Sequence, residues 1–248
     1  MNDKHVIKFC TLFFLLCCLV LFSPLVTSAR IKGTKHDLSI TGGGSAKAIS
    51  ETQICIFCHT PHNADPAYPL WNHQLSAVTN YKHYISNTLQ SYTNEGEAPP
   101  IDGISKLCLS CHDGTVAVGS VASRFDDIQM ESSPCLDAAG RLIDGVGCGG
   151  FIGTDLSGGH PISIVFNEAL KIKRDQATEL CPLNWPINDP DVKLYPTHTP
   201  ELQGVQCSSC HDPHTNKSIS GWPPFWQKTE HDLVCNVCHA SCTQDWPW

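Results

Sequence analysis

Four short segments of the chain repeat one arrangement of reactive side chains: two cysteines separated by two residues and followed at once by a histidine. This arrangement is typical of attachment sites for c-type haem, in which two thiols bond to porphyrin vinyl groups and the histidine binds the iron from one side. Because all four copies are complete, we expect four covalently attached haems. The residues are Cys55, Cys58 and His59; Cys108, Cys111 and His112; Cys207, Cys210 and His211; and Cys235, Cys238 and His239.

Two other interpretations of the motifs are a zinc site and a dithiol redox site. Pairs of cysteines also build four-cysteine zinc ribbons, and 24 residues separate the third pair from the fourth. A ribbon, however, does not need a histidine after every second cysteine, and all four motifs have one. A dithiol redox motif is expected in a βαβ unit, which the sequence does not indicate. The sequence therefore favours haem.

The ligand on the other side of each iron is expected to be histidine. The chain has only two methionines, Met1 and Met130, but 13 histidines, of which His5 lies in the leading segment and four belong to the motifs. Iron bound by histidine on both sides has no vacant position for a substrate, so we expect an electron carrier and not an enzyme. The eight spare histidines are His36, His62, His73, His83, His160, His198, His214 and His231.

The local sequence singles out four of these as the other iron ligands. His62 and His214 each follow a motif histidine by three residues, with a proline between, so each can reach a neighbouring iron but not the far side of its own haem. His160 lies between a Gly-Gly pair and Pro161, and His36 lies in an N-terminal arm. We therefore expect these four histidines to complete the coordination of the four irons.

The other spare histidines are weaker candidates. His73 and His83 lie among polar and aromatic residues that could form ordinary surface, and His198 lies between two prolines in a predicted turn. His231, close to the fourth motif, is the strongest reserve.

The first 29 residues have the layout of a secretory signal peptide. Lys4 and Lys8 precede an apolar run over residues 9–22, and Thr27-Ser28-Ala29 fits the cleavage rule, so the mature chain is expected to begin at Arg30. The run is about 14 residues long, too short to span a bilayer comfortably. We therefore expect export to the cell surface or medium, or to the periplasm, with no membrane span after cleavage. A lipid anchor on a cysteine of this run is the weaker alternative, because it would leave an apolar stretch on the mature protein.

Four cysteines of the predicted mature chain lie outside the motifs. An even number of spare cysteines in an oxidising compartment predicts two disulfides. We favour Cys135–Cys148, which closes a short glycine-containing loop, and this leaves Cys181 to pair with Cys242. Free buried thiols are the alternative.

Residues 30–248 are expected to form one tetrahaem domain. Residues 30–130 hold the first two motifs, residues 131–206 hold no motif, and residues 207–248 hold the last two. The 17 prolines and 18 glycines, with little hydrophobic periodicity, predict a mostly irregular fold with a few short helices. We expect one helix over residues 165–176 and a short helical turn at each motif. The formal net charge of −8 argues against nucleic-acid binding, which needs a basic surface.

Five segments of the chain resemble one family. They are similar to the doubled-CXXCH multihaem cytochromes of metal-reducing bacteria, and within these to the tetrahaem extracellular cytochromes that polymerise as nanowires. The resemblance implies a fold organised around four stacked and T-shaped haems, and filaments in which one iron takes a histidine from the next subunit. Redox partner cytochromes or extracellular electron acceptors are the partners that it implies. The segments are residues 55–63, 69–72, 105–119, 153–161 and 207–214.

The sequence thus predicts an exported tetrahaem cytochrome that carries electrons as an extracellular filament. His62, near the N-terminal edge of the motif series, is expected to bind the last iron of the adjacent subunit. A monomeric or dimeric electron shuttle is the first alternative. A reductase with one open iron is the second. The sequence departs from the resembling family at His73, in the segment 135–181 and after His239.

Overall fold

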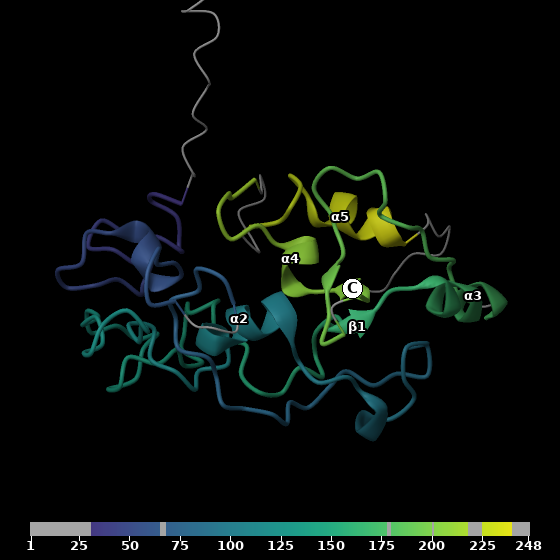
Figure 1. The fold of residues 1–248 in the computed structure, drawn as a ribbon, viewed down its shortest axis with the longest axis horizontal. Coiled ribbons are helices and arrows are strands. Elements are labelled where there is room, and N and C mark those ends of the chain that lie inside the picture. Colours follow the sequence, from purple (N-terminus) through teal and green to yellow (C-terminus); the bar gives the residue numbers. More distant parts are fainter. Residues whose placement is uncertain (1–30, 65–67, 178–179, 200, 218–224, 240–248) are drawn as a thin grey trace, which may run out of the picture.

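The computed structural model describes residues 31–64, 68–177, 180–199, 201–217 and 225–239. The predicted signal peptide and Cys242 lie outside these ranges. Most of the described chain is irregular, as predicted, with short helices and one small sheet (Figure 1). The elements in chain order are η1 (Ile54–Phe57), η2 (Glu95–Glu97), α2 (Gly103–His112), β1 (Ile164–Val165), α3 (Glu168–Gln176), β2 (Tyr195–Pro196), β3 (Gln203–Val205), α4 (Cys207–Cys210) and α5 (His231–Cys238).

The helix expected over residues 165–176 is present as α3 but begins at Glu168. Asn167 ends the extended segment before it, and its side-chain oxygen accepts a hydrogen bond from the Leu170 amide at 2.9 Å. Such a cap satisfies an amide that the first turn leaves without a partner. Val165, which we expected in the helix, instead pairs with Gly204 in the sheet. The expected start was therefore wrong by three residues, because strand pairing and the cap together decide where the helix begins.

The sheet connects the middle of the chain to the third motif. β3 is the central strand and pairs antiparallel with β1 and β2. A Cβ on Gly204 would lie 2.3 Å from the Ile164 carbonyl oxygen, so only glycine fits in this strand. One residue after β3, Gln206 caps α4 through reciprocal hydrogen bonds with Ser209. The sheet therefore determines where α4 and its two cysteines begin.

Many of the buried apolar side chains of the described residues form three small clusters, each beside a motif. The first involves the sheet and α3, the second packs on η1, and the third packs on α2. Cys238 contacts the first cluster and Cys58 the second. The members are Tyr92, Ile164, Phe166, Leu170, Leu183 and Val205; Ala48, Phe57, Val121 and Ile128; and Tyr81, Ile101 and Leu109.

The predicted disulfide between Cys135 and Cys148 is confirmed, with a Cα–Cα distance of 5.3 Å. Cys181 is also disulfide-bonded, and its predicted partner, Cys242, lies outside the described residues. In the part of the chain that the structure describes, no helix is long and apolar enough to cross a bilayer.

Candidate functional site

Each of the four motifs lies on a helical turn, which confirms the expectation for these segments. η1, α2, α4 and α5 each hold motif cysteines, and the motif histidine lies at or just after the last turn. Cysteines three residues apart project from the same face of a helix. The amides of His59, His211 and His239 donate to the carbonyl of the first cysteine of their motifs at 2.8, 3.0 and 2.9 Å. The turn therefore presents two thiols and an imidazole together.

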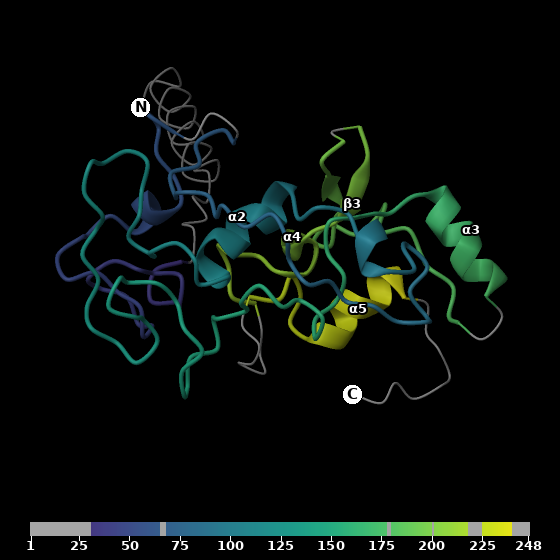
Figure 2. The ribbon, with the colours of Figure 1, turned by 90° about the horizontal axis from the view of Figure 1, so that it is seen from below.

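Thiols of different motifs lie close enough to affect one another. A hydrogen bond with Cys207, together with burial, raises the pKa of Cys108. Burial and then the neighbouring Cys58 raise the pKa of Cys111. Burial raises the pKa of Cys210 to about 12, and both thiols of the fourth motif add to this shift. The four motifs therefore form a series of neighbours, and α2, α4 and α5 follow one another along the longest axis (Figures 1 and 2).

Three of the four predicted second ligands face a motif histidine across a short gap. The ring centres of His36 and His112 are 6.0 Å apart, with an interplanar angle of 69°. Those of His59 and His214 are 6.0 Å apart, at 14°. The third pair consists of His160 and the fourth motif's histidine, His239, at 6.3 Å and 70°.

These separations fit a single metal ion between the two rings. With metal–nitrogen bonds of about 2 Å and ring centres about 1 Å behind each nitrogen, imidazoles on opposite sides of one ion are about 6 Å apart. A direct ring stack is closer, as for His36 on Phe225, whose centres are 4.3 Å apart. In each of the three pairs, one ring comes from a motif whose two thiols could hold a porphyrin. The donor set therefore fits haem iron with two histidine ligands.

Four of these rings have an acceptor beside Nδ1. In three the acceptor is a backbone carbonyl, and in the fourth it is a carboxylate. Nδ1 of His36 donates to the Pro213 carbonyl at 3.2 Å, and Nδ1 of His160 to the Pro161 carbonyl at 2.8 Å. Nδ1 of His112 donates to the Gly150 carbonyl. Nδ1 of His214 lies 3.6 Å from a carboxylate oxygen of Asp212. A proton on Nδ1 leaves the lone pair on Nε2, so these contacts select the tautomer that can bind a metal through Nε2.

Burial keeps the site imidazoles neutral. Burial and the neighbouring His112 lower the pKa of His36 to about 4. Burial and then His160 lower the pKa of His239 to about 4. Burial also lowers the pKa of His112 and of His160. At neutral pH these rings are therefore in the unprotonated form that metal binding requires.

His62, the fourth predicted second ligand, differs from the other three. Its side chain is exposed. Among the described residues its imidazole forms no hydrogen bond, ion pair or ring contact. Its backbone is held by Thr60, whose hydroxyl donates to the His62 carbonyl at 2.7 Å. His62 therefore has an exposed imidazole on a held backbone and belongs to none of the ring pairs among the described residues.

The expectation that His73 forms ordinary surface was wrong. His73 is 1% exposed, and its Nε2 lies 3.2 Å from Sγ of Cys111 in the second motif. An extended segment brings it there: Trp71 and His73 share a face, and His73 forms an isolated β-bridge with Val121. The alternation of Trp71 and His73 is the one sequence signal that could have placed this histidine at the site.

The other weaker candidates have neighbours of other kinds, and His231 also lies 6.3 Å from Trp226, the ring that stacks on His211. Nδ1 of His198 is 3.1 Å from Asp102, and Nε2 of His231 is 2.7 Å from Asp232. The ring of His83 lies edge-on to Tyr92. None of the three ring pairs described above includes these residues.

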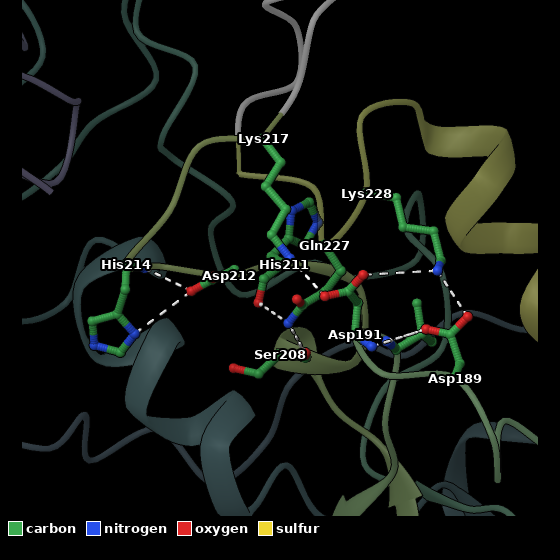
Figure 3. Close-up of polar contacts among 10 residues, drawn as sticks. Asp189, Asp191, Ser208, His211, Asp212, His214, Lys217, Gln227 and Lys228 are labelled. Carbon is green, nitrogen blue, oxygen red and sulfur yellow. Dashed lines mark hydrogen bonds and ion pairs between the residues drawn. The ribbon is translucent and has the colours of Figure 1, made fainter. Parts of the chain in front are cut away.

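A polar network surrounds the third motif (Figure 3). Nε2 of Gln227 donates to the carbonyls of Ser208 and His211 at 3.0 and 3.4 Å. Ion pairs join the segment before β2 to the segment before α5, Asp189 to Lys228 at 2.8 Å and Asp191 to Lys217 at 2.7 Å. The His211 ring stacks on Trp226 at 4.5 Å. These contacts fix α4 and His211 from two distant parts of the chain.

A zinc ribbon through the last two motifs would need its ligands to converge on one point. The four cysteines of these motifs are all described. Across the described ranges, no group of three or more His, Cys, Asp or Glu side chains is arranged to hold a bare metal ion.

In comparisons with known proteins, no family model and no curated protein matches the chain.

Proposed function

We propose that this chain is an exported tetrahaem c-type cytochrome that carries electrons through irons bound by two histidines. The observation that supports this most is the set of three facing histidine pairs, with ring centres 6.0, 6.0 and 6.3 Å apart, each including a motif histidine. Chance packing has no reason to repeat this separation three times at residues already singled out by motif and spacing.

On this proposal, the cysteines of the chain would attach the haem and the histidines would bind its iron. The paired cysteines on each helical turn hold the cofactor covalently, so it stays in place through changes of oxidation state. The two imidazoles of a pair occupy both open sides of the iron and exclude a substrate. When bound, haem supplies reversible one-electron chemistry at its iron. Contact between neighbouring motifs would keep the four cofactors within electron-transfer distance, in a fold organised around stacked haems.

The experiment that tests this proposal is mass spectrometry of the secreted protein under denaturing conditions. We expect a chain from about Arg30 carrying four haem masses. Fewer haems, or zinc, would overturn the proposal. Adding carbon monoxide to the reduced protein separates a carrier from a reductase, because only an iron with an open side binds it. We expect no spectral shift, and a shift would favour the reductase alternative.

We further propose that the protein polymerises through His62. This imidazole is exposed and has no partner among the described residues, and its backbone carbonyl accepts a hydrogen bond from Thr60, close to the first motif in the sequence. It could therefore bind an iron of an adjacent subunit. The last motif, which we expected to receive it, already has His160 facing His239.

Replacing His62 by alanine tests the filament. We expect His62→Ala to keep four haems, to leave one iron per chain high-spin and to abolish filaments in negative-stain images. His198→Ala is the matched control, because His198 is also exposed but faces no motif histidine. Normal filaments with all irons low-spin in His62→Ala would contradict this assignment and favour the alternative of a non-polymeric shuttle.

A further inference from the structure

A disulfide-closed loop lies beside the second motif. The disulfide joins Cys135 to Cys148, 13 positions later in the sequence. Inside the loop, the Ile143 amide donates to the Cys135 carbonyl at 3.1 Å. A Cβ on Gly145 would lie 2.5 Å from the Pro134 carbonyl oxygen and 3.0 Å from Sγ of Cys148. No side chain fits at Gly145, so the backbone packs directly against the disulfide.

The residues that follow this loop bind His112 from two sides. Two residues after Cys148, the carbonyl of Gly150 accepts the hydrogen bond from Nδ1 of His112. The amides of Ile152 and Gly153 donate to the His112 carbonyl at 2.7 and 3.1 Å. The ring and the backbone of this histidine are therefore both held by one short segment.

The carbonyl of Gly150 is fixed from both directions along the chain. Downstream, the amides of Ile152 and Gly153 fix the segment to the His112 backbone. Upstream, Cys148 is held by its disulfide and by a hydrogen bond from its amide to the Gly145 carbonyl at 2.9 Å. Val146 is fully exposed and Gly147 has open space around it, so the disulfide is the covalent link between this turn and Cys135. Opening the disulfide would therefore release the upstream side of the carbonyl that orients the His112 ring.

We propose that the Cys135–Cys148 disulfide positions His112, and that opening it raises the reduction potential of the second haem alone. The inference rests on the proposed function, in which His112 is an iron ligand. A hydrogen bond from Nδ1 to a carbonyl makes an imidazole a stronger electron donor, which favours ferric iron. Loosening that bond favours ferrous iron. A dithiol reductant could open the disulfide, giving two electrons and two protons to the two cysteine sulfurs and leaving as its own disulfide.

The test is a redox titration of the double variant Cys135→Ser/Cys148→Ser with its haems attached. We expect the reduction equilibrium constant of one haem to rise about tenfold, which is about 59 mV for a one-electron couple, with the other three unchanged. The ferric ligand-field spectrum of that haem should shift as well. Cys181→Ser/Cys242→Ser is the matched control, because it removes a different pair of spare cysteines and should leave all four haems unchanged.

Three outcomes separate this inference from the proposed function. Mass spectrometry showing fewer than four haems in the unmodified protein would refute the proposed function itself. Four haems with unchanged potentials in the double variant would refute the inference alone, as would an equal shift of all four. If the double variant does not fold, the Cys181→Ser/Cys242→Ser variant, in which Cys135–Cys148 is the remaining pair of spare cysteines, is reduced with a phosphine, alkylated at these two thiols and reoxidised at its haems. The same shift of one haem is expected there, and no shift overturns the inference.

Discussion

Replacing His214 by alanine is the sharpest test of the histidine pairs. The ring of His214 lies 6.0 Å from that of His59 and nearly parallel to it. Nδ1 of the ring also lies 3.6 Å from a carboxylate oxygen of Asp212. We expect His214→Ala to remove the second ligand of the iron at the first motif and to leave the other three irons as they are.

The size of the effect follows from the pairing. One of the four motif histidines faces His214, so one quarter of the iron should become high-spin. The His214 side chain is 52% exposed and its contact with Asp212 is long. Apart from the coordination bond itself, loss of this surface contact changes the free energy of unfolding by about 0.5 kcal/mol or less. A high-spin signal would therefore report a lost ligand and not a partly unfolded protein.

The assay combines electron paramagnetic resonance of the oxidised protein with carbon monoxide uptake by the reduced protein. We expect about one carbon monoxide per chain in His214→Ala and none in the unmodified protein. His198→Ala is the control: its side chain is also exposed and also lies beside a carboxylate, that of Asp102 at 3.1 Å. It should remain fully low-spin. A variant His214→Ala with four low-spin irons and no carbon monoxide uptake would refute the pairing.

Two further predictions concern stability. Leu109, in α2, is 1% exposed within a three-residue cluster, so Leu109→Ala should lower the free energy of unfolding by about 3 kcal/mol in urea titrations. Ile172→Ala, at an exposed position of α3, should change it by about 0.5 kcal/mol or less, and equal losses would contradict the assigned core. A hydrogen bond from Lys82, followed by those from Ser157, lowers the pKa of Asp155 from 3.8 to about 2. Stability from this carboxylate is complete above the higher value and is lost as pH falls through the lower one, so Tm values of the unmodified protein and Asp155→Asn should converge from pH 5 to pH 2. A Tm difference that stays constant over this range would argue against the ion pair.

Local features of the structure were predictable because their causes lie within a few residues. The helical turns at the motifs need only a three-residue spacing that presents both thiols on one side. The Cys135–Cys148 disulfide follows from a short loop rich in glycine and an even number of spare cysteines. α3 was placed over most of its length, although pairing of Val165 with Gly204 shifted its start. That strand contact joins residues far apart in the chain, and no local pattern reveals it.

Most members of the candidate site were predictable, but their pairing was not. Motif and spacing identified His36, His160 and His214, and a single sequence cannot say which motif histidine each one faces. His73 was missed because its burial depends on a β-bridge to Val121, which follows the second motif in the sequence.

By itself, the sequence determined which reactive groups this protein carries: four thiol pairs with adjacent imidazoles, eight spare histidines, and a leading segment with the layout of a signal peptide. Only the tertiary structure decided that His36 faces His112, that His214 faces His59, and that the four motifs are neighbours in chain order. It alone also placed the Gly150 carbonyl on His112. The physical reason is that residue types and short spacings define which atoms can react. Which of them meet depends instead on long irregular segments, whose course is set by contacts between distant residues.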